Sequence, residues 1–147
     1  MKRMLFLLAT CLLLSSCGMN SRNETTAQTE TQTETIKDGV EVLYFHGKQR
    51  CATCIAIEKN TRAVTDSLQT VSSDHTGLTF RIIDISKAEN EELARKYEVT
   101  WSSLFLVRHK NGQETAENLT EFAFKNARKS PETFQAGLAR KIHEMQQ

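Results

Sequence analysis

Cys51 and Cys54, three residues apart in the stretch FHGKQRCATCIAIE, are the clearest candidates for chemistry in this chain of 147 residues. Residues at this spacing lie on one face of a helix, where two thiols are within reach of a disulfide bond. Such a pair can exchange electrons with other thiols, bind a soft metal ion, or form a permanent structural bridge. The surroundings that the rest of the sequence gives to the pair help to decide among these three chemistries.

The start of the chain determines which of the four cysteines remain in the mature protein. Residues 1–16, MKRMLFLLATCLLLSS, combine a basic start with an apolar run too short for a stable membrane anchor, which is typical of a secretory signal peptide. The sequence LSSC at residues 14–17 resembles the lipobox of bacterial lipoproteins, at which the signal is removed and the new N-terminal cysteine is lipidated. This resemblance implies that Cys11 is lost and that Cys17 carries the lipid, which leaves Cys51 and Cys54 free to react.

The lipobox therefore predicts a lipid-anchored protein of the cell envelope, outside the cytoplasm and facing the periplasm in a cell with two membranes. Residues 17–38 form the lipidated cysteine and a polar segment, which we expect to be a disordered tether. Residues 39–147 have the length of a single domain.

Composition excludes several classes of function. Without Lys2 and Arg3, the 19 basic residues become 17 against 18 acidic ones, a net charge of −1, which does not indicate a nucleic-acid partner. The six glycines form no G-x-G-x-x-G pattern, so we expect no flavin or nicotinamide and, more generally, no cofactor.

The globular part alternates strand and helix patterns. Apolar, β-rich runs predict strands at residues 40–45, 78–85, 103–109 and 113–118, the last after a turn at Lys110-Asn111-Gly112. Helices are predicted at residues 52–68, 86–97, 120–124 and from 131 onward. Their start signals are a capping box from Ser86 to Glu89, an N-cap at Thr120 and Pro131 at the first helical position. The first helix carries Ile55, Ala56, Ala63, Val64 and Leu68 at helical spacing, and the last one carries Phe134, Leu138, Ile142 and Met145 on one face.

This order predicts a three-layer α/β fold, and with a CxxC motif at the first strand-to-helix junction it resembles the thioredoxin fold. Three stretches carry the resemblance: VEVLYFHGKQRCATC, FRIIDISKAENEELARKYEVT and LFLVRHKNG. The resemblance implies a central mixed four-stranded sheet flanked by helices. Within that superfamily, FHGKQRCATCIAIE together with VTWSSLFLV is similar to the nitrophenyl compound nitroreductase subunit ArsF family, which implies support for the reduction of nitroaromatic or arsenical compounds.

Two positions depart from the thioredoxin pattern. Ser103 stands where the superfamily has a cis-proline, and a cis bond between Ser102 and Ser103 costs about 3–4 kcal/mol, so we expect that bond to be trans. Leu43 and Tyr44 stand where thioredoxins place a buried carboxylate that takes the proton of the second cysteine.

The sequence predicts a division of roles around the cysteines. Cys51 at a helix start is the nucleophile, because free backbone N–H groups and the basic residues Arg50 and Lys48 favour its thiolate. Cys54 is the more buried, resolving thiol, and His46 is close enough in sequence to tune the pair. By resemblance, the loop of Trp101, Ser102 and Ser103 receives a partner.

Thiol–disulfide exchange is the favoured interpretation, with a protein partner that includes a membrane electron transporter among the candidates. The alternative is a binding module in which Cys51 and Cys54 hold a soft metal ion or trivalent arsenic without redox turnover. A purely structural bridge is the weakest interpretation, because it closes a very short loop and removes little chain entropy.

Overall fold

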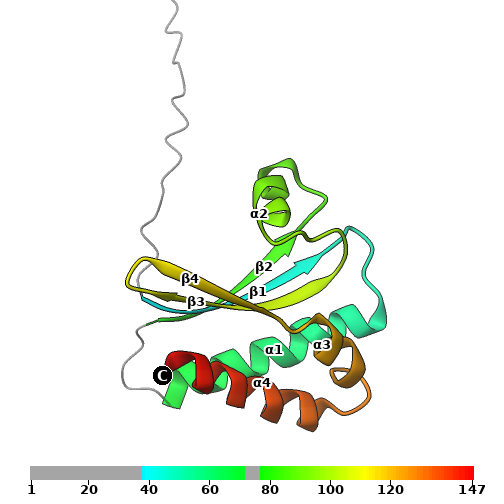
Figure 1. Ribbon diagram of the computed structural model, residues 1–147. Coiled ribbons are helices and arrows are strands. Elements are labelled where there is room, and N and C mark those ends of the chain that lie inside the picture. The colour runs from blue at the N-terminus through cyan, green and yellow to red at the C-terminus, as the bar shows by residue number, and fades with distance from the viewer. Residues whose placement is uncertain (1–37, 72–76) are drawn as a thin grey trace, which may run out of the picture. The chain divides into compact units, whose positions relative to one another are not determined.

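A computed structural model of the chain describes residues 38–71 and 77–147, all of which belong to one compact unit, Glu34–Gln147 (Figure 1). The predicted signal peptide, the lipobox with Cys17 and nearly all of the predicted tether lie outside the described residues. Among the helices described, none combines the length and the apolar character that crossing a membrane requires.

A mixed four-stranded sheet is the centre of the fold, with the strand order β2-β1-β3-β4. The strands are β1 (Gly39–His46), β2 (Leu78–Asp84), β3 (Ser103–Lys110) and β4 (Gln113–Asn118). Strand β2 runs parallel to β1, whereas β3 is antiparallel to both β1 and β4. The sequences of β1 and β3 are apolar on successive residues, so both strands are buried on both faces and occupy the middle of the sheet.

Helices cover both faces of the sheet. Figure 1 shows α1 (Ala52–Val71), α3 (Thr120–Asn126) and α4 (Pro131–Gln146) on one face, and α2 (Glu91–Lys96), preceded by a 3₁₀ turn (Ala88–Asn90), on the other. The larger core cluster lies on the α1 and α4 side and the smaller one on the α2 side. The predicted three-layer α/β fold with a mixed four-stranded sheet is confirmed.

Strand β4 has an almost entirely polar sequence, QETAEN, which suits an edge strand. It follows a two-residue turn in which Asn111 and Gly112 have φ angles of 54° and 74°, the left-handed conformation that Asn-Gly hairpins require. Glu114 pairs with Lys96 of α2 at 2.5 Å, and Glu117 pairs with Lys141 of α4. The edge strand is therefore connected to both helical layers.

Three local predictions were wrong. Ser86 does not open a capping box, because its backbone N–H and its hydroxyl both donate to Asp84 Oδ1, and α2 begins only at Glu91. Thr120 is the first helical residue rather than the cap. The Thr120 hydroxyl accepts a hydrogen bond from the backbone N–H of Leu104, and the backbone N–H of Thr120 donates to Asn118 Oδ1.

The third error concerns the buried face of α1. Ile55 is 55% exposed and Ala63 is exposed, whereas Val64 is buried and Ala56 and Leu68 pack against the core, as their spacing suggests. The rest of the buried face is formed by Cys54, Ile57, Asn60, Thr61 and Thr65. Pro131 is indeed the first residue of α4, and Phe134, Leu138 and Ile142 of that helix are buried as predicted.

Phe134 tests the main core. Its side chain is fully buried and stacks on Phe122 with ring centroids 5.5 Å apart. We expect Phe134→Ala to lower the free energy of unfolding by about 3–5 kcal/mol, because it removes a large apolar side chain and leaves a cavity. Urea unfolding of the oxidised protein measures this, with Thr133→Ala on the exposed side of the same turn as the control. A loss no larger than that of the control would contradict this account of the core.

Candidate redox site

The cysteines lie where two loops meet at one edge of the sheet. Strand β1 ends at His46 and the chain then enters α1 through residues 47–50, while β3 starts directly after Trp101 and Ser102. Phe45 and Ser103 are paired in the antiparallel ladder, so both loops leave the sheet at the same place. The loop that was predicted to receive a partner is therefore beside the cysteines.

Cys51 and Cys54 form a disulfide bond, with their Cα atoms 5.0 Å apart. Cys51 is exposed, whereas Cys54 is only 5% exposed. The backbone N–H of Cys54 donates to Cys51 Sγ at 3.1 Å, and the N–H of Ile55 donates to the carbonyl oxygen of Cys51 at 3.0 Å. Cys51 thus stands in the N-cap position of α1, where the same N–H group favours a thiolate after reduction.

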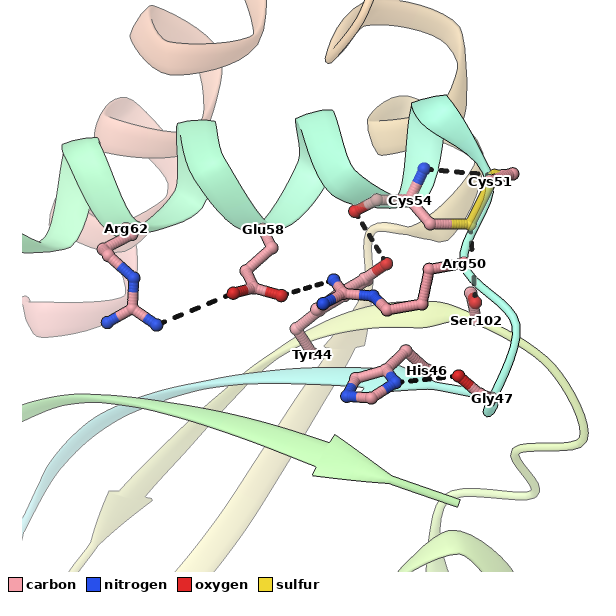
Figure 2. A network of polar contacts seen from close by, with 9 residues as sticks. All are labelled: Tyr44, His46, Gly47, Arg50, Cys51, Cys54, Glu58, Arg62 and Ser102. Carbon is pink, nitrogen blue, oxygen red and sulfur yellow. Dashed lines mark hydrogen bonds and ion pairs between the residues drawn. A yellow bond between two sulfur atoms is a disulfide. The ribbon is translucent and has the colours of Figure 1, made fainter. Parts of the chain in front are cut away.

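Ser102 is the closest polar side chain of the opposite loop. Its Oγ lies 3.7 Å from Cys54 Sγ (Figure 2). Because a disulfide sulfur carries no hydrogen, the hydroxyl is the donor in the oxidised state, and the same oxygen can accept from a Cys54 thiol after reduction. The described residues contain no cis peptide bond, so the bond between Ser102 and Ser103 is trans, as expected.

Beneath the disulfide lies a network formed by Tyr44, Arg50 and Glu58 (Figure 2). The Tyr44 hydroxyl donates to the carbonyl oxygen of Cys54 at 2.9 Å. Arg50 forms an ion pair with Glu58, and its guanidinium lies 5.7 Å from the centre of the Tyr44 ring. Arg62 approaches the same carboxylate from the next turn of α1, at 3.8 Å.

Burial and charge set the protonation states in this network. Burial raises the pKa of Tyr44 above its ordinary value, against the opposing influence of Arg50, so the phenol stays neutral. Burial alone would lower the pKa of Arg50, but its interactions with Glu58 and Tyr44 outweigh burial and raise that pKa, so the guanidinium stays charged.

Three residues were predicted to tune the cysteines, and their side chains have different surroundings. Arg50 forms an ion pair with Glu58, and its effect on the Cys51 thiolate stays a prediction. Lys48 is exposed. His46 Nδ1 lies 2.9 Å from the carbonyl oxygen of Gly47, and its ring centre is 6.1 Å from that of Tyr44.

Two members of the network were missed as functional residues. Tyr44 was noted only as the residue that replaces a carboxylate, and Glu58 was not singled out. Glu58 follows Cys54 by four residues, the spacing that places two side chains on the same helix face, so the signal was present in the sequence.

Two large apolar side chains are exposed next in sequence to Cys54 and Ser102. Trp101 and Ile55 are 57% and 55% exposed, and the Trp101 ring packs on Phe124 with centroids 5.1 Å apart. A groove of about 730 Å³ is lined by Trp101, Asn118, Thr120, Glu121, Phe124 and Lys125.

The metal alternative can be tested against the donors present. Across residues 38–71 and 77–147, no group of three or more His, Cys, Asp or Glu side chains is placed to hold a metal ion. The reduced cysteines alone supply two sulfur ligands, which does not complete a four-ligand zinc site. Among the described residues, the two cysteine sulfurs would therefore suit only an ion that two thiolates can bind.

Known proteins are similar to this chain in structure and not in sequence. No protein-family model matches the chain, and no curated protein is detectably similar. A structure of human ERp44 matches with a TM-score of 0.54 and 16% identity over 86% of this chain. The ERdj5 structure matches with a TM-score of 0.50 and 10% identity over 74% of it. The fold is thioredoxin-like.

This chain spans 30% of the ERp44 chain and 13% of the ERdj5 chain, so each match concerns a part of a larger protein. A thioredoxin of Fasciola hepatica, of which this chain covers 85%, has 20% identity and a TM-score of 0.48. At these identities the likeness establishes the fold alone, and membership of the ArsF family stays a prediction.

The two tyrosines of the chain provide a pH test, since burial raises the pKa of both above 10.0: Tyr44 lies in the site, and Tyr97 follows α2 on the other face of the sheet. A raised pKa in the folded state means that the neutral phenol is favoured by folding. We therefore expect this contribution to stability to be complete below pH ~10 and to be lost as the pH rises through the folded-state pKa values. Tyrosinate absorbance measures the titration, with the urea-unfolded protein as reference. A folded protein that titrates like the unfolded chain would contradict the buried Tyr44 network.

Proposed function

We propose that this protein is a thiol–disulfide oxidoreductase that acts on protein partners through Cys51 and Cys54. The observation that carries the proposal is the Cys51–Cys54 disulfide at the start of α1, in which Cys51 is exposed and Cys54 is buried. The exposed residue also accepts a hydrogen bond from a helix N–H group. These are the properties that an attacking and a resolving cysteine need.

The exchange proceeds in two displacements. In the reduced protein the Cys51 thiolate attacks one sulfur of a partner disulfide, which forms a mixed disulfide and releases the other partner sulfur as a thiolate that takes up a proton. Cys54 then loses its proton and attacks Cys51 Sγ, which restores the Cys51–Cys54 bond and releases the second partner thiol. Two electrons pass from the protein to the partner, and the reverse sequence oxidises a partner dithiol.

Several contacts support these steps. The backbone N–H of Cys54, 3.1 Å from Cys51 Sγ, stabilises negative charge on the attacking sulfur. Ser102 Oγ is close enough to Cys54 Sγ to hydrogen-bond the thiol before it loses its proton. The exposed Trp101 and Ile55 are adjacent in sequence to Ser102 and Cys54, and offer an apolar surface to the partner segment that carries the disulfide.

A purely structural bridge is disfavoured. The bond joins residues only three positions apart, so it removes little entropy from the unfolded chain. Cys51 is also an exposed residue, whereas a buried bridge would be better protected from external thiols. A bridge that served only to stabilise the fold would be expected to close a longer loop and would not need an exposed cysteine.

The wider proposal places the protein in the cell envelope, attached through lipid on Cys17 and facing the periplasm where there are two membranes. Its support is the lipobox sequence at residues 14–17 and the Cys51–Cys54 disulfide, since disulfides persist in oxidising compartments outside the cytoplasm. A membrane electron transporter is a suitable redox partner there. Support for the reduction of nitroaromatic or arsenical compounds rests on the ArsF resemblance.

The second candidate function is capture of a soft metal ion or trivalent arsenic by the reduced pair. The observation that favours it is the contact between Cys54 Sγ and Ser102 Oγ, which puts a polar oxygen beside the sulfurs in a loop that has Ser103, and no proline, at its end. In this case Cys51 and Cys54 are ligands and no disulfide turnover takes place.

An equilibrium redox titration separates the two functions. The full chain with Cys11→Ser and Cys17→Ser, which keeps only the two site thiols, is equilibrated with mixtures of reduced and oxidised glutathione. We expect reversible, two-electron behaviour, and formation of trapped mixed disulfides with envelope proteins when Cys54→Ser is added. The matched Cys51→Ser variant is expected to trap none. Stoichiometric arsenite binding without mixed disulfides would reject exchange and favour capture.

The lipid anchor has its own test. Cells that express the full chain are grown with radiolabelled palmitate and separated into soluble and membrane fractions. We expect label and membrane association in the native chain, and the loss of both in Cys17→Ser, because stable anchoring needs the acyl chains. Cys11→Ser is the control and is expected to keep both. Label that survives Cys17→Ser would reject this lipidation site.

A further inference from the structure

The ion pair between Arg50 and Glu58 is close to the redox pair in sequence and is connected to it in space through Tyr44. Arg50 is the residue before Cys51, and Glu58 follows Cys54 by one turn of α1. Figure 2 shows the Arg50 side chain extending back beneath the first turn of the helix to reach Glu58. The two side chains are 27% and 23% exposed, so water and salt screen them less than a surface pair.

The same network holds both cysteines. Arg50 is covalently joined to Cys51, and its guanidinium lies against the Tyr44 ring. The hydroxyl of Tyr44 in turn holds the carbonyl oxygen of Cys54. Glu58 fixes the far end of the Arg50 side chain, so it determines where the positive charge nearest to Cys51 in the sequence is held.

The charges of Arg50 and Glu58 have opposite effects on the reduced form of the site. Reduction of the disulfide places negative charge on Cys51 whenever this sulfur is a thiolate, and a nearby guanidinium stabilises that state. A carboxylate paired with the guanidinium offsets the stabilisation. The offset acts on the reduced state alone, because the disulfide carries no charge.

We infer that Glu58 is a positioning residue that sets the reduction potential of the Cys51–Cys54 disulfide. By holding and partly neutralising Arg50, Glu58 makes the disulfide harder to reduce than the helix start and Arg50 would make it by themselves. The inference rests on the proposed exchange reaction for its use in the cell, and extends that function by naming the residue that sets the redox balance of the site.

The test measures the equilibrium in which the protein disulfide and two glutathione molecules give the protein dithiol and one oxidised glutathione. We expect Glu58→Gln, which keeps a hydrogen-bonding group for Arg50 but removes the charge, to raise this equilibrium constant about tenfold, a shift of about +30 mV. Arg50→Met is expected to lower it about threefold, because it leaves the carboxylate without its main counter-charge. The rate at which iodoacetamide modifies reduced Cys51 is expected to rise in Glu58→Gln and to fall in Arg50→Met.

Three controls separate tuning of the potential from loss of structure. Glu58→Asp keeps the charge and is expected to stay close to the wild-type potential, whereas a purely structural role would make the shorter side chain as harmful as Gln. Glu91→Gln removes a carboxylate that pairs with Arg95 on α2 and is expected to change nothing. Urea unfolding of each oxidised variant shows whether it is folded.

An equilibrium constant for Glu58→Gln within twofold of the wild type, or below it, would overturn the inference. So would a Glu58→Asp variant that shifts as far as Glu58→Gln. Failure of the proposed function gives a different result, because the potential would still respond to Glu58 while Cys54→Ser traps no partner proteins.

Discussion

The position of β1 between β2 and β3 is the constraint from which the rest of the site follows. A strand with neighbours on both edges and helices over both faces is mostly apolar, and Val40, Val42, Leu43, Tyr44 and Phe45 are all buried. The one charged residue in this run, Glu41, is also buried and pairs with Arg81 of β2. Because β3 runs antiparallel to β1, the end of one strand and the start of the other meet at the same edge of the sheet. That meeting brings Ser102 to Cys54 across 48 positions of sequence.

The same strand explains why a tyrosine belongs beneath the cysteines. Tyr44 points toward α1, where its ring fills the core cluster and its hydroxyl reaches the first turn of the helix. An aromatic ring can be buried there because its one polar atom has a partner. Arg50 and Glu58 then satisfy each other at the margin of this core, where neither is fully withdrawn from water. The polar groups of the site are therefore organised by one apolar strand.

The elements of the fold were largely predictable from the sequence, since long periodic stretches such as β1 and α4 carry strong patterns. The errors occurred where the local sequence pattern did not determine which neighbouring group a side chain contacts. Ser86 matched a capping box, but Asp84 offered a nearer acceptor. Ile55 fits a helical apolar pattern, yet the turn that brings Cys54 and Ile57 inward leaves Ile55 in solvent.

The site was predictable only in part for a related reason. Cysteine spacing identifies the reactive pair, and the thioredoxin resemblance supplies the opposite loop. The contacts of Tyr44 with Cys54 and of Arg50 with Glu58 depend on how far α1 sits above β1 and on side-chain directions, which spacing alone does not fix. Because many functions share this fold, those particular contacts distinguish the chain more than the fold does.

Strand β4 has a consequence for the behaviour of the sheet as a whole. Edge strands are usually the first to open in a folded domain, and they expose backbone groups that pair readily with other chains. Here Glu114 reaches Lys96 on one layer and Glu117 reaches Lys141 on the other, so opening of β4 breaks contacts to both layers at once. The charged edge thus resists fraying and also discourages two copies of the protein from joining edge to edge into a continuous sheet.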